Sequence, residues 1–478
     1  MTAPTLATPW HRRGRLYGLP TSLVVKLAAG EVSESIPTTL DVRSRAQAPA
    51  ASVDGGVVDR LIRHHAEGAR VARLYSAAAS LGHVGQRHTR YDDLEHVLGL
   101  SRTLRIEVPL GTPIDHLIDA LSQSPTVEAA GANHLCTAPF EMSSPGVEPE
   151  LAWASRAQIK APAAMAYEPG DPAMIVAIVD SGIPEQHSEF EDRFRTGYNA
   201  VQLHGGDLAP GLRLLNDDAG LRTRPIDHHV GHGTGCAGII GARGNSLPPG
   251  LAGECPMLPI RVLGAANLPG KTGAIGIGAL ADIDHGVKMA VDLDARVLNM
   301  SFGTADSALD ATAPKPHRDV IQYALARGCV LVAASGNSGV EEIFWPAAFD
   351  GVIAVAAVDA SGRPTAFSTR GAHVALAAPG ENIITTGLVG LQVATGTSFA
   401  APFVAAAAAL LVSRAGRRSF PIDGAQVRQL LIESAAPFPG RSVPGCGAGL
   451  LDAQAALVTL DRAIDAASDA KPDDGDER

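Results

Sequence analysis

Residues 396–402 read Gly396-Thr397-Ser398-Phe399-Ala400-Ala401-Pro402, and an alanine-rich apolar run follows them to Val412. The run predicts a buried helix that begins near Ser398, because Pro402 is tolerated in a first turn, where a missing N–H costs little. The N–H groups and the positive dipole end of that helix would then face Ser398. A serine hydroxyl is a weak nucleophile that needs a base and oxyanion donors. Alone, the stretch fits either a reactive serine or a small-residue helix start in a core.

Three other polar residues occupy positions that suit such a serine. Asp180 ends an apolar run that predicts a buried strand, and Asn337 follows a second such run. His232 lies among the small residues 231–238, which let a helix pack tightly behind an imidazole. An aspartate at a strand end can orient a histidine, and an asparagine amide can donate to an oxyanion. Each position is weak evidence alone, but the order Asp, His, Asn, Ser predicts a nucleophilic serine site.

These four stretches, in this order, resemble the subtilisin-like serine proteases (subtilases, peptidase family S8) over about residues 152–460. The resemblance implies that Ser398 is the nucleophile and His232 the general base, then acid. It implies that Asp180 orients His232 and that Asn337 donates to the oxyanion together with the Ser398 backbone N–H. The expected activity is therefore that of a serine endopeptidase, which hydrolyses protein or peptide substrates through an acyl-enzyme.

Two alternatives use the same fold. One is a peptide ligase or cyclase, which would release the same acyl-enzyme with an amine instead of water. The other is a catalytically silent binding module. All four positions of the expected site hold a residue type that can react, so we expect an enzyme, while the choice between hydrolysis and ligation stays open because it depends on the second nucleophile.

The resemblance also places a substrate pocket between two short uncharged segments. Their residues are Ser301, Phe302 and Gly303 in one segment and Ala334, Ser335 and Gly336 in the other. An unpaired substrate charge would be costly to bury there, so we expect apolar or aromatic residues at P1, the residue on the acyl side of the scissile bond.

No cofactor is expected to be required, although subtilases often bind structural calcium. Glu189 stands where a calcium ligand of the family lies relative to Asp180. Calcium needs oxygen ligands that converge from several segments, and a single carboxylate is more often an ordinary surface residue.

Strand and helix patterns alternate after residue 174, which predicts an α/β fold with a mainly parallel sheet and helices on both faces. The expected division is an N-terminal region (1–145), a subtilisin-like catalytic domain (146–462) and an acidic, disordered tail (463–478). The expected elements of the N-terminal region are an unpatterned stretch (1–51), a helix (57–81) and a small β-α-β unit at about 100–140.

The β-α-β unit stands where subtilases commonly carry a propeptide that assists folding and inhibits the enzyme until it is removed. An extended run at 133–140 follows the unit and is long enough to reach the cleft, where it could add a strand near Ser301. We therefore expect the N-terminal region to act as an intramolecular inhibitor, with self-cleavage between about Cys136 and Ala152. A permanent accessory domain is the alternative.

Composition restricts the partners and the compartment. A net charge of −11 argues against a nucleic-acid partner held by phosphate contacts. No apolar run approaches the ~18 residues of a membrane span, and the longest, 403–412, suits a buried helix. Residues 1–19 lack the apolar core of a Sec signal peptide, and five scattered cysteines suit reduced thiols. We expect a cytoplasmic protein, with export by a non-classical route left open and any separate inhibitor protein unknown.

Overall fold

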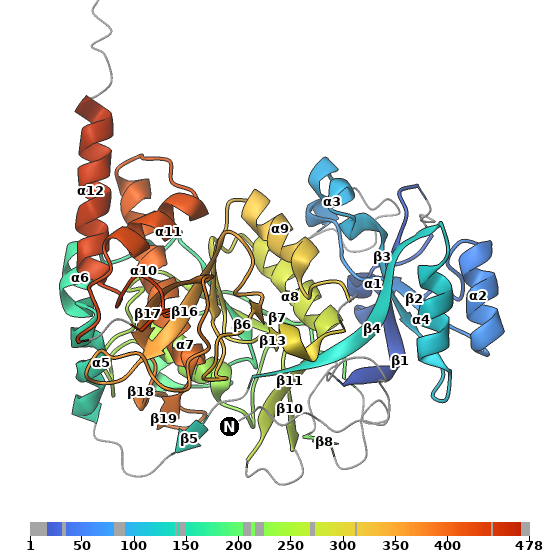
Figure 1. Cartoon of the computed structure of the whole chain (residues 1–478), viewed down its shortest axis with the longest axis horizontal. Coiled ribbons are helices and arrows are strands. Elements are labelled where there is room, and N and C mark those ends of the chain that lie inside the picture. The colour runs from blue at the N-terminus through green and yellow to red at the C-terminus, as the bar shows by residue number, and fades with distance from the viewer. Residues whose placement is uncertain are drawn as a thin grey trace, which may run out of the picture.

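The computed structural model describes residues 17–30, 35–80, 91–138, 141–143, 149–203, 212–215, 224–267, 273–310, 313–440 and 443–469. Figure 1 shows a main domain (149–469) beside a smaller N-terminal domain (18–138). A seven-stranded sheet in the order β17-β16-β14-β12-β6-β9-β7 forms the centre of the main domain, and all its pairs are parallel. Its strands are Val176–Asp180 (β6), Tyr198–Asn199 (β7), Met257–Arg261 (β9), Val297–Met300 (β12), Val330–Ala334 (β14), Val352–Val358 (β16) and Val374–Pro379 (β17).

Helices cover both faces of this sheet, as the predicted α/β class requires, because a parallel sheet must bury both faces. In β6, Val176 and Ile178 join one hydrophobic cluster and Ala177 and Val179 join the other. The first face carries Ala152–Gln158 (α5), Ala161–Tyr167 (α6), His232–Gly241 (α7), Thr397–Arg417 (α10), Gly424–Glu433 (α11) and Ala453–Asp469 (α12). The second carries Leu280–Asp292 (α8) and Arg318–Ala326 (α9).

Helix α10 is the central core helix of the main domain. Among the described helices it alone has the length and apolar composition of a membrane span, and it extends beyond the run 403–412 considered from sequence. In the structure, 89% of that apolar window is buried inside the protein. Its hydropathy is therefore explained by packing against the sheet, as the sequence predicted for a buried helix behind Ser398.

The C-terminal boundary predicted from sequence is wrong by several residues. Residues 463–469, assigned to the disordered tail, continue α12. Ile464 is buried on the apolar face of that helix, and Asp465 forms an ion pair with Arg418 at 2.6 Å. These tertiary contacts stabilise a helix that its acidic composition disfavours. The rest of the predicted tail, 470–478, lies outside the described residues.

The N-terminal domain is an antiparallel sheet in the order β2-β3-β1-β4. Its strands are Gly18–Leu27 (β1), Arg70–Arg73 (β2), Thr103–Glu107 (β3) and Val127–Ala138 (β4), and its helices are Thr39–Arg43 (α1), Val57–His65 (α2), Asp93–Val97 (α3) and Ile114–Ser122 (α4). The elements β3, α4 and β4 occupy the predicted β-α-β unit.

Two predictions about this domain are wrong. The stretch 1–51 contains β1, a central strand of the sheet, and the helix predicted over 57–81 ends at His65, before β2. Gly68 interrupts the helical pattern there, and glycine disfavours a helix interior. Pairing with β3 on one edge then selects the strand, a choice that depends on residues distant in sequence.

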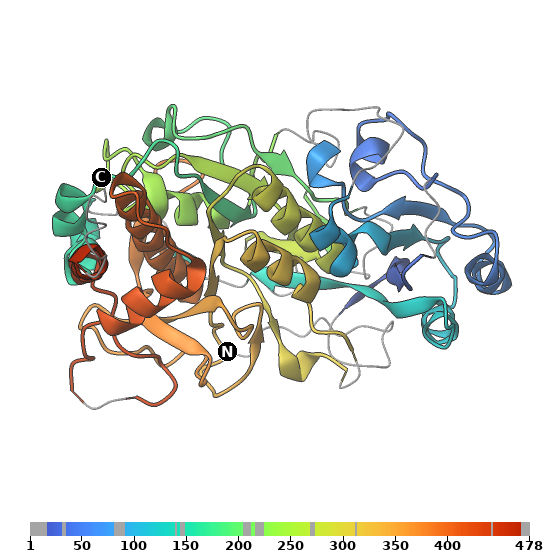
Figure 2. The ribbon, with the colours of Figure 1, turned by 90° about the horizontal axis from the view of Figure 1, so that it is seen from above.

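The N-terminal domain docks on α8 and α9 of the main domain, as the view from above in Figure 2 shows. Arg105 forms an ion pair with Asp282 at 2.7 Å, and Lys288 forms one with Glu95 at 2.6 Å, with all four side chains almost fully buried. Removing one partner of such a pair leaves an uncompensated buried charge, which costs about 3–5 kcal/mol. The interface is therefore specific as well as extensive.

His285 on α8 is fully buried in the same interface. Its Nδ1 lies 2.8 Å from the backbone oxygen of Leu74, and its Nε2 lies 2.9 Å from the hydroxyl of Tyr198. Burial lowers the pKa of His285 to about 3, since a charged imidazole would lose its hydration there. The docked state therefore holds this histidine neutral.

Acidification from pH 7 to 5 should lower the melting temperature of the wild type more than that of His285→Gln. An unfolded imidazole takes up a proton below pH 6.5 and the folded one does not, so stability falls by up to about 1.4 kcal/mol per pH unit. Burial raises the pKa values of Asp282 and Asp292, which acts in the opposite direction, but this contribution is shared by both proteins. Scanning calorimetry at several pH values measures the difference; parallel curves would contradict the assignment.

Candidate active site

Asp180 and His232 meet at the carboxyl end of the central sheet. Asp180 ends β6, and His232 begins α7 directly after Gly231, whose φ of 75° turns the chain into the helix. The Nδ1 of His232 lies 2.7 Å from Oδ1 of Asp180, and both side chains are fully buried. A carboxylate accepts the hydrogen of Nδ1, which leaves Nε2 as the basic nitrogen of the ring.

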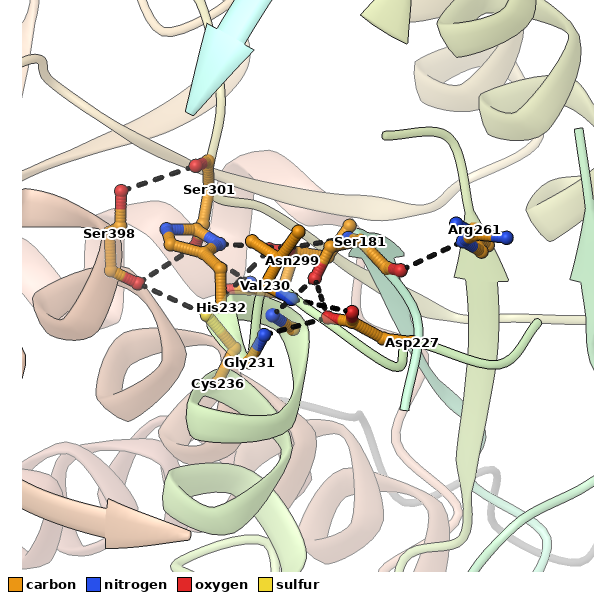
Figure 3. A network of polar contacts seen from close by, with 12 residues as sticks. Ser181, Asp227, Val230, Gly231, His232, Cys236, Arg261, Asn299, Ser301 and Ser398 are labelled. Carbon is orange, nitrogen blue, oxygen red and sulfur yellow. Dashed lines mark hydrogen bonds and ion pairs between the residues drawn. The ribbon is translucent and has the colours of Figure 1, made fainter. Parts of the chain in front are cut away.

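A second buried aspartate holds this pair in place, and sequence reasoning missed it. Asp227 accepts hydrogen bonds from the hydroxyl of Ser181 at 2.7 Å and from the backbone N–H groups of residues 229, 230 and 231 (Figure 3). Ser181 Oγ in turn accepts from the N–H of Gly233. Asp227 lies between the Asp180 and His232 stretches, outside the motifs that the sequence analysis singled out. In the sequence, Asp227 precedes its backbone donors by only two to four residues, which is a common turn pattern and does not by itself indicate a supporting role.

Ser398 lies in the first turn of α10, close to His232. The ring of Phe399 packs on the ring of His232, with 5.2 Å between centroids. Ser398 and Ser301 exchange hydrogen bonds: the Ser398 hydroxyl donates to the backbone oxygen of Ser301 at 3.2 Å, and the Ser301 hydroxyl donates to that of Ser398 at 2.8 Å (Figure 3). The candidate nucleophile is thus hydrogen-bonded to Ser301, the residue that directly follows β12.

Asn337 is held against the same helix start. Its Oδ1 accepts from the N–H and from the hydroxyl of Thr397, both at 2.9 Å. This assignment of the amide makes Nδ2 the donor side, and a Cβ at Gly396 would lie 3.2 Å from that nitrogen. The amide of Asn337 therefore lies beside the backbone turn that leads into Ser398, where an oxyanion donor is needed.

Cys236 lies beneath the histidine, one helical turn along α7. Its Sγ lies 3.4 Å from the backbone oxygen of Ser398 and 3.7 Å from Oδ2 of Asp180. Ligand atoms of Asp180, His232 and Cys236 are within 4.8 Å of one another, close enough to share a metal ion. However, burial raises the pKa of the Cys236 thiol well above its usual range, and the other two residues already bind each other. The arrangement fits a packed thiol better than a metal ligand.

The two predicted substrate segments flank the start of α10. Ser301 contacts Ser398 directly, and the N–H of Gly336 donates to the hydroxyl of Thr397 at 3.2 Å. Three of the six predicted side chains are buried and engaged within the protein. Phe302 is buried in the core with its ring against His317, Ala334 is buried in the core, and Ser335 donates to the backbone oxygen of Thr369.

Phe344 fills the space between these segments, and no sequence pattern pointed to it. A Cβ added at Gly303 would lie 2.3 Å from Cε1 of Phe344, and one added at Gly336 would lie 3.1 Å from Cγ. The ring therefore contacts a glycine of each segment. Phe344 belongs to the short strand Phe344–Trp345 (β15), which pairs with Thr304–Ala305 (β13).

The segment that leaves the N-terminal domain pairs with strands of the main domain next to this site. Strand β4 pairs antiparallel with Ile275–Ala279 (β11), and Thr137 also forms a bridge with Gly303. Strand β11 pairs antiparallel with Gly264–Asn267 (β10), which pairs antiparallel with Arg213–Leu214 (β8). Beyond Ala138, Glu141–Ser143 (β5) pairs with Leu391–Thr395 (β19), whose other partner is Ile383–Thr386 (β18). Strands of one segment thus lie on both sides of Ser398.

Glu189, the calcium ligand suggested from sequence, anchors a turn. Its carboxylate accepts hydrogen bonds from the N–H groups of Gly244, Asn245 and Ser246 and from the Ser246 hydroxyl, at 2.5–3.1 Å. Burial acts to raise the pKa of Glu189, but these donors outweigh it and hold the pKa below its usual range. Both oxygens are already engaged by protein donors.

Any effect of EDTA on the melting temperature should therefore be the same in the wild type and in Glu189→Gln. Glu189→Gln should itself lower the melting temperature, because the amide nitrogen would replace one acceptor with a donor that faces backbone N–H groups, at about 1–3 kcal/mol. Differential scanning fluorimetry with and without EDTA provides the measurement. A fall of several degrees with EDTA in the wild type, absent in Glu189→Gln, would restore the calcium assignment.

Comparison with known proteins identifies the family. A model of the "Subtilase family" matches residues 171–464. The "Thermophilic serine proteinase" of Bacillus sp. (strain AK1) is 30% identical over 68% of this chain and 72% of its own length, and "Subtilisin E" of Bacillus subtilis (strain 168) is 32% identical over 63% and 69%. The solved structure of the prenylagaramide maturation protease PagA is 26% identical, with a TM-score of 0.50, over 63% of this chain and 98% of its own. This chain belongs to the subtilase family of serine proteases.

Proposed function

We propose that this subtilase is a serine endopeptidase whose nucleophile is Ser398. The observation that carries the proposal is the buried 2.7 Å hydrogen bond between His232 and Asp180 beside the first turn of α10. That bond gives the imidazole a fixed tautomer and orientation, which a general base for a serine needs. Asn337, held by Thr397, supplies an amide donor next to the Ser398 N–H.

The proposed reaction begins when the Ser398 hydroxyl leaves the Ser301 carbonyl and turns to Nε2 of His232. Its proton passes to Nε2 while Oγ bonds to the substrate carbonyl carbon, and the carbonyl electron pair moves to oxygen. That oxyanion accepts hydrogen bonds from Asn337 and the Ser398 N–H. The imidazolium, stabilised by Asp180, then gives its proton to the leaving amine as the C–N bond breaks. Water repeats these steps on the acyl-enzyme and releases the acid product.

We further propose that the N-terminal domain inhibits its own enzyme until it is cut. Strand addition is the way in which extended peptides dock on a sheet edge, and here β4 and β5 add to β11 and β19. Because Ala138 is paired on one side of Ser398 and Glu141 on the other, chain continuity points to a scissile bond between these two residues. The buried ion pairs with α8 would keep the cut domain bound, so release would be a separate step from cleavage.

Labelling with a fluorophosphonate probe and analysis of the adduct by mass spectrometry test the proposal. A single adduct on Ser398, with hydrolysed products from a casein digest, is expected. Absence of the adduct in protein whose N-terminal fragment has been released would contradict the nucleophile assignment. Products joined to an added peptide amine would instead indicate the ligase alternative, since only the second nucleophile differs between the two reactions.

A further inference from the structure

We propose that Phe344 closes the P1 pocket, so that this enzyme cleaves after small residues such as glycine, alanine and serine and disfavours aromatic ones. The inference rests on the proposed function, because it concerns the substrate of the same serine. It changes the expectation from sequence, in which two uncharged segments suggested an apolar or aromatic P1 residue. The difference comes from one side chain that lies between those segments.

The position of the pocket follows from contacts of the reacting residues. Ser301 exchanges hydrogen bonds with Ser398, and Gly336 donates to Thr397. Both segments therefore lie next to the nucleophile, one on each side. In the substrate pocket expected from sequence, the P1 side chain lies between these two segments while its carbonyl carbon reaches Oγ.

The ring of Phe344 occupies that gap. It contacts Gly303 so closely that an added Cβ would lie 2.3 Å from Cε1, and it contacts Gly336, where an added Cβ would lie 3.1 Å from both Cγ and Cδ2. A Cβ atom is not tolerated within 3.0 Å of another heavy atom, so the ring lies directly against the backbone of Gly303 and leaves no space for even a methyl group there. One aromatic ring spans the two walls, and a second ring from a substrate would need the same volume.

The backbone of Phe344 is fixed on both sides. Ala305 pairs with Phe344, and Thr304 pairs with Trp345, in the short β13–β15 ladder. The indole N–H of Trp345 donates to Asp306 at 2.7 Å, and the backbone oxygen of Phe344 accepts from Ala348 at 2.9 Å. Phe344 is half-buried, and a substrate could displace its ring only by rotating the side chain away from Gly303 and Gly336, which costs free energy that a small P1 residue does not require.

The chain's own sequence between the two docked strands offers a second readout. Ala138, Pro139 and Phe140 precede the three peptide bonds that join β4 to β5. A closed pocket favours cleavage after Ala138 or Pro139 and disfavours cleavage after Phe140. N-terminal sequencing of the mature fragment identifies the bond, and a fragment that begins at Glu141 would count against the inference.

The direct test compares wild type with Phe344→Gly on peptides that differ only at P1, with Ala, Ser, Leu or Phe. For the wild type we expect kcat/KM to be at least tenfold higher for Ala than for Phe. Phe344→Gly should raise the ratio of kcat/KM for the Phe peptide to that for the Ala peptide at least tenfold, because only the large side chain needs the volume that the ring occupied. Ile343→Gly is the matched control, since its side chain is exposed on the neighbouring position, and it should leave the ratio unchanged.

The outcomes separate this inference from the proposed function. If the fluorophosphonate probe labels Ser398 and the wild type cuts the Phe peptide as fast as the Ala peptide, the pocket inference is wrong and the protease assignment stands. If Ser398 is not labelled and no peptide is cut, the function itself fails and the inference fails with it. The wild-type ratio decides the question even where Phe344→Gly does not fold.

Discussion

Ser398→Ala should lower kcat for peptide cleavage by about 10⁶-fold, to the background of the assay. Nucleophile and base act as a unit in the proposed mechanism, so removal of the hydroxyl removes the whole covalent route. The substitution removes one buried oxygen atom and its hydrogen bond to the Ser301 carbonyl, so the fold should persist. Stopped assays with a chromogenic peptide, combined with circular dichroism, measure both quantities.

The same variant reports on self-cleavage. The 478-residue chain should stay intact in Ser398→Ala, whereas the wild type should separate into two fragments on electrophoresis. Ser413→Ala is the matched control, because Ser413 is a buried serine of the same helix whose hydroxyl donates to the backbone oxygen of Ala409 and contacts Sγ of Cys255 at 3.5 Å. Ser413→Ala should cleave itself and its substrates. A wild-type chain that is fully active while uncut would favour a permanent accessory domain instead.

Asn337→Ala should lower kcat by about 10²–10³-fold and leave KM nearly unchanged, because the amide acts on charge that exists only in the transition state. The variant also removes the acceptor of two hydrogen bonds from Thr397, so a loss could reflect a disturbed helix start. Asn337→Asp separates these causes, since a carboxylate keeps the acceptor and lacks the donor. It should lose at least as much activity.

Asn245→Ala is the control for this pair, because the Asn245 amide donates to the backbone of Ser188, far from α10, and should leave kcat unchanged. Equal kcat in wild type and Asn337→Asp would show that the donor is not part of the reaction. A large increase in KM with unchanged kcat would assign Asn337 to substrate binding.

Local pattern predicted a large part of this protein. Apolar runs that end in Asp180 and before Asn337 form buried parallel strands, and the alanine-rich run after Ser398 forms the core helix. Each of these elements is specified by the pattern of apolar side chains within one short segment, so the sequence predicts it without knowledge of the rest of the fold. Parallel strands then bring their carboxyl ends to one edge, so the order of motifs already placed the candidate site.

Local pattern failed where a structure depends on residues far apart in the chain. Strand β1 is defined by two neighbours across the N-terminal sheet, and the end of α12 is stabilised by Arg418. Asp227 accepts the N–H of Gly231, directly before His232, from a segment outside the four recognised motifs. In each case the deciding interaction is tertiary, and neither propensity nor spacing records it.

The sequence by itself determined the family, the α/β sheet and the four candidate catalytic residues, because these depend on motifs that each occupy one short segment. Only the tertiary structure decided how the site meets a substrate. It placed the ring of Phe344 against both Gly303 and Gly336, two glycines from separate segments of the sequence, and it paired β4 with β11 and β5 with β19. Whether a gap is empty or filled depends on the packing of all the side chains that surround it, and these come together only once the fold has formed.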